Sequence, residues 1–107
     1  MDSPRMDGIM ATFSEDIDKL FNVAYLTSGY TKEEILSESR IRPLVYVRMT
    51  LAKKLWSLIP NVTVIGSILN RTHCTVLYWN RNFTDNYEYD DVFKAYYDRF
   101  ETIYLQQ

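Results

Sequence analysis

The chain has 107 residues, of which 47% are hydrophobic and 24% are charged, and this composition is that of one ordinary globular domain with a modest core. No apolar run reaches the roughly 18 residues that cross a bilayer, and the N-terminus is acidic where a secretory signal is basic and then apolar. The single cysteine cannot form an internal disulfide, so we expect a cytoplasmic protein without a membrane partner.

The formal net charge of −2 is unevenly distributed along the chain. Residues 31–82 carry eight basic and three acidic side chains, a balance of +5, whereas both flanking segments are acidic. No acidic residue lies between Ser39 and Thr84. Because a basic segment between acidic flanks can present one positive face to a polyanion, the net charge does not exclude a nucleic-acid partner.

The first third of the chain predicts two helices. Residues 1–11 show no periodicity, so we expect a flexible N-terminus there and a single domain over residues 12–107. Ser14 is expected to cap a first helix that Gly29 ends. The sequence from Thr31 has the T-x-x-E form of a capping box and predicts a short helix, which the polar loop SESRIR follows.

The middle of the chain predicts a long helix and a short one. Pro43 suits the first turn of the long helix, and Pro60 ends it. Its expected buried stripe consists of Leu44, Val47, Leu51, Leu55 and Leu58. Asn61 or Thr63 is expected to cap the brief apolar helix that follows.

The last third predicts two further helices around a loop. After the tight polar connection NRT, Thr72 is expected to cap a helix over about residues 73–82. We expect FTDNYEYDD to be a loop, and a last helix to run from about Asp91 to Tyr104. Its buried face is expected to consist of Phe93, Tyr97, Phe100 and Tyr104. No convincing alternating run predicts a strand, so the expected fold is all-α with about six helices.

His73 and Cys74 are the only histidine and the only cysteine, and they are adjacent. A zinc site needs three or four protein ligands, which this chain does not offer near them. Neighbours on a helix point about 100° apart, so we expect that the two side chains cannot face each other as a catalytic dyad. We therefore expect no metal, no cofactor and no enzyme activity. The plainest interpretation is a surface histidine beside a cysteine that fills the core.

A more specific interpretation comes from the helices on either side of the NRT connection. Two short helices joined by a tight turn form a helix-turn-helix, whose second helix enters the major groove of DNA by its N-terminal residues. The residues expected to contact bases are Thr72, His73, Cys74 and, one turn further along, Tyr78. Arg71 and Thr75 are expected to contact phosphates, whereas Val76 and Leu77 are expected to pack inward.

Three stretches of the sequence resemble one family. NRTHCTVLYW is similar to the G/N-R-D-H-x-T-V-L-H signature in the C-terminal DNA-binding domain of the bacterial replication initiator DnaA. EEILSESRIRPLVYVR resembles that domain's D-L-L-S-x-x-R-x-R run, and NVTVIGSIL resembles its S-L-x-x-I-G-x-x-F helix. The resemblance covers roughly residues 12–105 and implies an all-α, Trp-repressor-like fold with a helix-turn-helix. It also implies double-stranded DNA and replication proteins as partners, at the nucleoid.

The resemblance also implies roles for single residues. Arg40 and Arg42 match the basic loop that enters the minor groove, and Arg48 matches an arginine that grips the DNA backbone. His73 matches the base-contacting histidine, and Thr75 matches a phosphate-contacting threonine. Three positions depart from the signature and put the target sequence in doubt. The signature aspartate is Thr72 here, the following threonine is Cys74, and a later histidine is Tyr78.

The initiator's ATPase module has no counterpart in the chain. Its phosphate-binding loop has the form G-x-x-x-x-G-K-[ST], whereas the only glycines here are Gly8, Gly29 and Gly66. We therefore expect no nucleotide ligand. The start of the sequence and its acidic extension favour a small stand-alone protein, with an excised domain as the alternative. Two functions remain open at this point. One is sequence-specific binding of double-stranded DNA, and the other is a protein-interaction module that keeps the fold and binds a replication partner instead.

Overall fold

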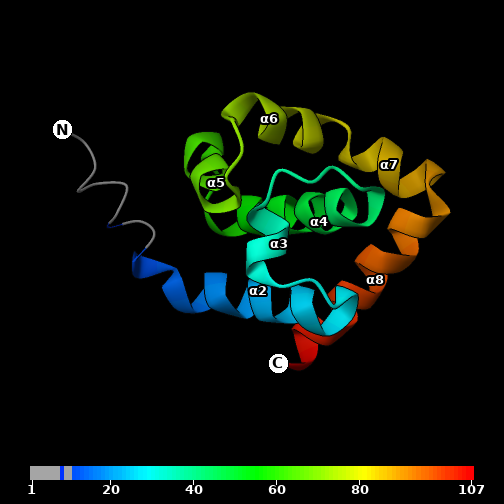
Figure 1. Ribbon diagram of the computed structural model, residues 1–107, viewed down its shortest axis with the longest axis horizontal. Helices are drawn as coiled ribbons and strands as arrows, with labels where there is room; N and C mark the ends of the chain where they lie inside the picture. The colour runs from blue at the N-terminus through cyan, green and yellow to red at the C-terminus, as the bar shows by residue number, and fades with distance from the viewer. Residues whose placement is uncertain (1–7, 9–10) are drawn as a thin grey trace.

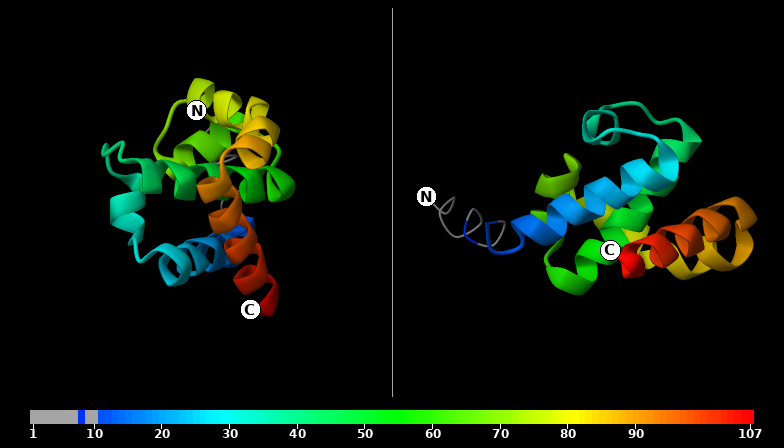
Figure 2. Two further views of the ribbon diagram at one scale, coloured as in Figure 1. Left: turned by 90° about the vertical axis from the view of Figure 1, so that its right-hand side faces the viewer. Right: turned by 90° about the horizontal axis from the view of Figure 1, so that it is seen from below.

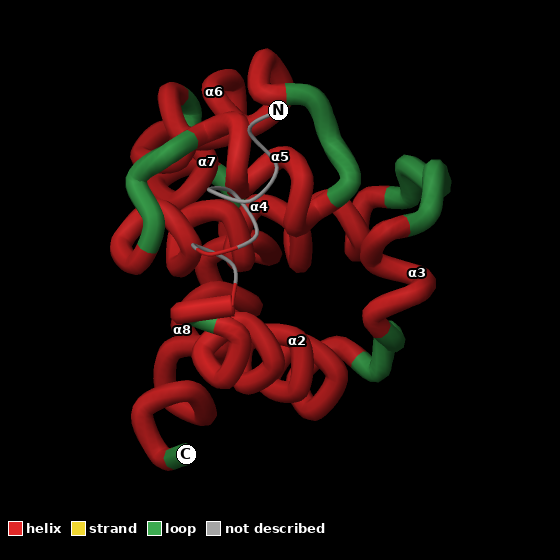
Figure 3. The backbone as a smooth tube through the Cα atoms, turned by 90° about the vertical axis from the view of Figure 1, so that its left-hand side faces the viewer, coloured by secondary structure: helices red, strands yellow, loops and turns green. Residues whose placement is uncertain are grey.

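Every regular element of the described chain is an α-helix. The computed structural model describes residue 8 and residues 11–107, and no strand occurs among them (Figure 1, Figure 3). The helices are α2 (Ser14–Ser28), α3 (Lys32–Leu36), α4 (Arg42–Leu58), α5 (Val62–Leu69), α6 (His73–Arg81), α7 (Phe83–Tyr89) and α8 (Asp91–Gln106). The expected all-α fold is confirmed. The expected flexible N-terminus, residues 1–11, falls almost entirely outside the described residues.

Helix α4 is the centre of the fold. It lies between α5 and α6 on one side and α2 and α8 on the other, and α2 and α8 pack against each other (Figure 1, Figure 2). The leucines and the valine of its predicted stripe are buried as expected, except that Leu58 is half-buried. Phe93 and Phe100 of α8 are fully buried, whereas Tyr97 and Tyr104 on the same stripe are half-buried.

Most helix ends follow the expected capping chemistry. Thr31 and Glu34 form the reciprocal capping box of α3. Asn61 caps α5 by accepting hydrogen bonds from the backbone N–H groups of the second and third residues of that helix. Gly29 ends α2 with a left-handed φ of 82°. The expected cap at Ser14 is wrong, because Ser14 is already the first residue of α2 and no side chain caps that end.

The expected loop FTDNYEYDD is wrong, because Phe83–Tyr89 forms helix α7. Phe83 and Tyr87 are one helical turn apart and stack with ring centroids 5.9 Å apart. Both rings also meet Tyr97 of α8 edge-on, at centroid distances of 5.0 and 5.7 Å. The polar residues of this segment have weak helix propensity, so the packing of two aromatic rings against α8 stabilises the helix. None of the described helices is long and apolar enough to cross a bilayer.

Candidate nucleic-acid interface

Helices α5 and α6 pack against each other across a three-residue turn, Asn70–Thr72. Asn70 adopts a left-handed φ of 58°, and the N–H of Arg71 donates to the carbonyl oxygen of Gly66 at 2.8 Å. The backbone of the turn passes so close to α5 that a Cβ atom on Gly66 would lie 2.4 Å from the carbonyl oxygen of Arg71. Glycine is therefore required at position 66, and it fixes how closely the two helices meet.

The N-terminal end of α6 faces solvent. Thr72 caps the helix by accepting from the N–H of Thr75, and the side chains of Thr72, His73 and Cys74 are exposed. Tyr78, one turn later, is 62% exposed. The base-contact residues expected from the sequence are thus accessible at one end of one helix. The interpretation of Cys74 as a core residue is wrong.

The buried face of α6 differs from the expected one. Val76 is buried as predicted, but Leu77 is 37% exposed, so the prediction that it packs inward is wrong. Trp79 takes the second buried position, three residues after Val76. This spacing of three places Trp79 on the helix face that meets α4, whereas Leu77 lies about 100° away from Val76.

His73 and Cys74 approach each other, contrary to the prediction that they could not. The sulfur of Cys74 lies 3.7 Å from Nε2 of His73. His73 is the first residue of α6, so no preceding helical turn constrains its ring, which folds across to its neighbour. Across residues 8 and 11–107, no group of three or more histidine, cysteine or acidic side chains is arranged to hold a metal ion.

The turn between α5 and α6 is tied to the loop between α3 and α4. Nη2 of Arg71 donates to the carbonyl oxygen of Ser37 at 2.6 Å, and its Nη1 donates to the carbonyl oxygen of Asn70 at 2.9 Å. Nδ2 of Asn70 donates to the carbonyl oxygen of Leu36 at 3.1 Å. These bonds hold residues 37–41, which carry Arg40, beside the exposed end of α6.

Arg48 is buried and holds the same loop through hydrogen bonds to its backbone, so the prediction that it contacts phosphate is wrong. The side chain is 1% exposed. Nε donates to the carbonyl oxygen of Ile35 at 2.7 Å and Nη1 to that of Ser39 at 2.6 Å, while Nη2 donates to Ser37 at 3.0 Å and more weakly to Glu34 at 3.4 Å. Burial, together with the nearby charge of Arg71, lowers the pKa of Arg48 to about 10. Arg48 therefore shapes the loop.

The two arginines expected in the minor groove are separated. Arg40 lies in the loop and borders a polar cavity of about 510 Å³ that also includes Glu38, Asn70, Arg71, Thr72 and Thr75. Arg42 is the first residue of α4 and lies over the ring of Tyr46, with its guanidinium carbon 6.0 Å from the ring centroid. Arg42 thus lines a different cavity, among α2, α4 and α8. The structure places Arg40, and not Arg42, beside α6.

The charges around the polar cavity are largely unneutralised. Throughout the described chain, neither Arg40 nor Arg71 forms an ion pair, and Glu38 is the only acidic residue at the cavity. The lysines of α4 are occupied elsewhere, because Lys54 pairs with Glu101 at 2.8 Å and Lys53 lies over the ring of Phe83. Two guanidinium groups without an ion-pair partner in the described chain, those of Arg40 and Arg71, therefore lie between the 37–41 loop and the start of α6.

Sequence reasoning missed Asn70, Gly66 and Glu38 as parts of this site. Asn70 carries a usable signal, because asparagine directly after an apolar helix favours the left-handed C-cap. Gly66 lies within a helix that has little other reason to hold a glycine, which itself indicates a close backbone approach. Glu38 carries no comparable signal. No protein-family model matches the chain, and searches of curated proteins and of solved structures found no significant match.

Proposed function

We propose that the protein binds double-stranded DNA, with α5 and α6 acting as a helix-turn-helix whose second helix enters the major groove. One observation carries the proposal: the exposed start of α6 lies directly beside the unneutralised guanidinium groups of Arg40 and Arg71. A groove-reading helix needs this combination, because base edges are read by side chains at the helix start and phosphates are held by cations next to it. The resemblance of NRTHCTVLYW to the initiator signature supports the same assignment.

The roles of the residues follow from their exposure. Thr72, His73 and Cys74 contact base edges, and Tyr78 reaches the groove one turn further along. Arg40 enters the adjacent minor groove, where an arginine reads narrow A·T-rich shape. Arg71 and Thr75, at the border of the polar cavity, hold phosphates. Arg48 and Arg42 are not part of this set, because one is buried and the other lines a different cavity.

Selection of bound sequences from a random duplex pool tests the proposal, followed by affinity measurements over a range of salt concentrations. Two unneutralised guanidinium groups predict a log–log salt slope of roughly −2. Arg40→Ala should make that slope shallower by about one unit. Lys94→Ala on α8, which already pairs with Asp98 at 3.1 Å, is the matched control and should leave the slope unchanged. Absence of binding to every duplex at low salt would refute the proposal.

Base reading is tested separately with His73. His73→Ala should lower affinity for the selected site by about 1–3 kcal/mol and leave binding to unrelated duplexes nearly intact. Arg40→Ala should instead weaken binding to all duplexes whose A·T content is similar to that of the selected site, whether or not they contain that site. Equal losses on all duplexes for both variants would show that His73 does not contact a base.

The altered signature makes a prediction about the target. Aspartate at a helix start accepts from a cytosine amino group, whereas Thr72 can donate or accept, and Cys74 is a poor hydrogen-bond partner. The typical initiator box should therefore not be the preferred site. Thr72→Asp combined with Cys74→Thr should shift preference toward that box by about 1–3 kcal/mol per restored base contact. A competition between the box and the selected site measures the shift, and a wild-type preference for the box contradicts the assignment.

A further inference from the structure

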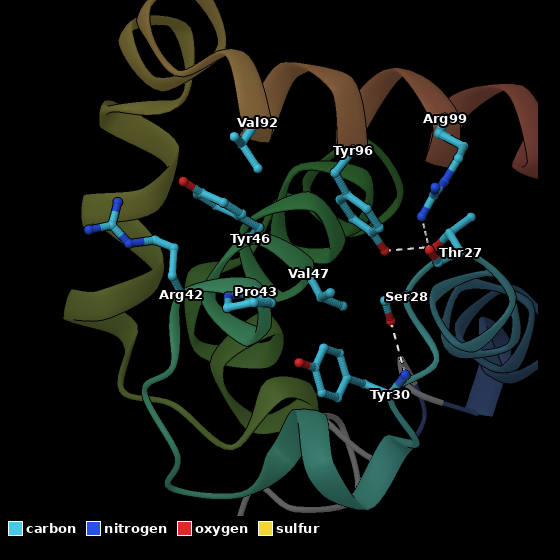
Figure 4. A pocket seen from close by; sticks show the side chains of 10 residues that line it. All are labelled: Thr27, Ser28, Tyr30, Arg42, Pro43, Tyr46, Val47, Val92, Tyr96 and Arg99. Carbon is cyan, nitrogen blue, oxygen red and sulfur yellow. Dashed lines mark hydrogen bonds between the residues drawn. The ribbon is translucent and has the colours of Figure 1, made fainter.

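A second cavity, of about 460 Å³, lies among the end of α2, the start of α4 and the first half of α8 (Figure 4). Three tyrosine rings, Tyr30, Tyr46 and Tyr96, surround Val47 in it. None of the residues that line it belongs to α5 or α6. A partner bound there would therefore leave the candidate nucleic-acid interface free.

Apart from the hydroxyl of Tyr30, the interior polar groups of this cavity are already hydrogen-bonded. Oγ1 of Thr27 and the hydroxyl of Tyr96 are 2.8 Å apart, and Oγ of Ser28 donates to the carbonyl oxygen of Ala24 at 2.6 Å. What remains for a ligand is mainly aromatic and aliphatic surface. Because an aromatic side chain gains most from such a surface, the cavity suits an aromatic ring.

Two arginine side chains lie at the rim of the cavity. The guanidinium groups of Arg42 and Arg99 lie on different sides of it (Figure 4). Arg99 donates to the carbonyl oxygen of Thr27, and no carboxylate in the described chain forms an ion pair with either arginine. A ligand that combines an aromatic ring with carboxylates matches both the interior and the rim.

The chain itself carries such a group next to the cavity. Tyr89 ends α7 and is 82% exposed, and Glu88 and Asp91 on either side of it are exposed carboxylates. Val92, three residues later, lines the cavity and is 66% exposed. A contact between two identical surfaces requires that the projecting group lie near the receiving cavity, and Tyr89 is three residues from Val92, which lines it.

We propose that two copies of the chain associate about a two-fold axis next to residues 89–92, each inserting Tyr89 into the other's cavity between α2, α4 and α8. Glu88 and Asp91 of one copy then face Arg42 and Arg99 of the second copy. The exposed apolar surface of Val92 is covered in the same contact. This inference does not depend on DNA binding.

Sedimentation velocity over a range of protein concentrations tests the proposal. The wild-type chain should show a concentration-dependent dimer. Tyr89→Ser should weaken the association at least about tenfold, because a ring that fills an interface pocket carries a large part of the binding energy. The matched control is Leu105→Ser, which removes a side chain that is 76% exposed at the other end of α8 and should change nothing. Circular dichroism verifies that each variant keeps its helices.

A mixing experiment tests reciprocity. Arg99→Glu should weaken the dimer because it repels the acidic residues of the second copy, while its own Tyr89 remains available. A chain with Tyr89→Ser keeps an intact cavity. Each variant alone loses both contacts, but a mixture restores one contact per heterodimer and should sediment as a heavier species than either variant alone.

Three results would overturn the proposal. One is a wild-type chain that stays monomeric up to about 1 mM, where even an association of about 4 kcal/mol would be visible. Another is equal weakening by Tyr89→Ser and Leu105→Ser, which would show that the dimer does not use the cavity. The third is a peptide of sequence DNYEYDDV, residues 85–92 of the chain, that causes no shift of the cavity residues in NMR spectra, which would show that the cavity does not receive Tyr89.

Discussion

Replacing Arg48 by methionine is expected to destabilise the fold without removing a DNA contact. The substitution keeps a long side chain but deletes the donors to the carbonyl oxygens of Ile35 and Ser39, both within 2.7 Å in the native chain. The carbonyl oxygen of Ser37 also loses its bond to Arg48 but keeps a partner, because it accepts from Arg71 at 2.6 Å. A buried carbonyl without a partner costs about 1–3 kcal/mol, and an exposed one regains water. The expected loss in free energy of unfolding, mainly from the buried carbonyl of Ile35, is therefore about 1–3 kcal/mol.

Urea unfolding followed by circular dichroism measures this loss for the wild type, Arg48→Met and Arg48→Lys. Lysine keeps the charge but not the planar fork that reaches several carbonyl groups, so it should recover only part of the stability. Arg48→Met should leave the salt slope of DNA binding unchanged, because no phosphate contact is removed. The reasoning would be refuted if Arg48→Met were as stable as the wild type and its salt slope were shallower by about one unit. Arg48 would then be a phosphate contact, as the sequence predicted.

Three further predictions concern the fold. Gly66→Ala should lower the free energy of unfolding by at least about 2 kcal/mol, because the new methyl group meets the carbonyl oxygen of Arg71. Thr50→Val should raise it by about 1 kcal/mol in the same urea assay, because the hydroxyl is fully buried and has no hydrogen-bond partner within the described chain. The hydroxyl of Tyr46 donates to Asp90 at 2.5 Å and holds the pKa of that carboxyl below its usual value of 3.8. This stabilisation is complete above the ordinary pKa and disappears as pH falls through the lower folded-state value, so Tyr46→Phe should flatten the acid side of the stability profile.

Each of these variants has a control of the same chemistry at an open position. Gly8→Ala adds a methyl group with nothing within 4 Å of it. Thr84→Val and Tyr25→Phe remove hydroxyl groups from exposed residues. These controls should stay within about 0.5 kcal/mol of the wild type. A Gly66→Ala variant as stable as Gly8→Ala, a destabilised Thr50→Val, or an unchanged acid profile for Tyr46→Phe would contradict the corresponding explanation.

Local signals predicted most of the helices, because the chemistry of helix ends lies within a few residues of sequence. The capping box at Thr31 and the caps at Asn61 and Thr72 form as expected. Helix α7 was not predictable in this way, since Phe83 and Tyr87 stabilise it by meeting rings of α8 that no local pattern contains. The local sequence of residues 83–89 therefore indicates only the weak helix propensity of its polar residues.

The candidate site divides in the same manner. Consecutive residues at the start of α6 could be grouped from the sequence alone, but the separation of Arg40 from Arg42 depends on α4 beginning at residue 42. The burial of Arg48 could have been predicted from its position, one turn after Leu44 and three residues before Leu51 on the buried stripe of α4. Its charge favoured an exposed position instead. Arginine is seldom fully buried, and only the tertiary arrangement brings carbonyl groups to its guanidinium.

The carbonyl oxygen of Ser37 has two donors, Nη2 of Arg48 and Nη2 of Arg71, at 3.0 and 2.6 Å. If a phosphate draws Arg71 outward, the oxygen keeps its bond to Arg48 and is not left without a partner. Recruitment of Arg71 to a ligand therefore gives up its bonds to Ser37 and Asn70, but the carbonyl oxygen of Ser37 stays bonded to Arg48. Because Arg48 also bonds to Ser37, Arg71 can hold the loop in the free protein and still be released to the proposed phosphate contact.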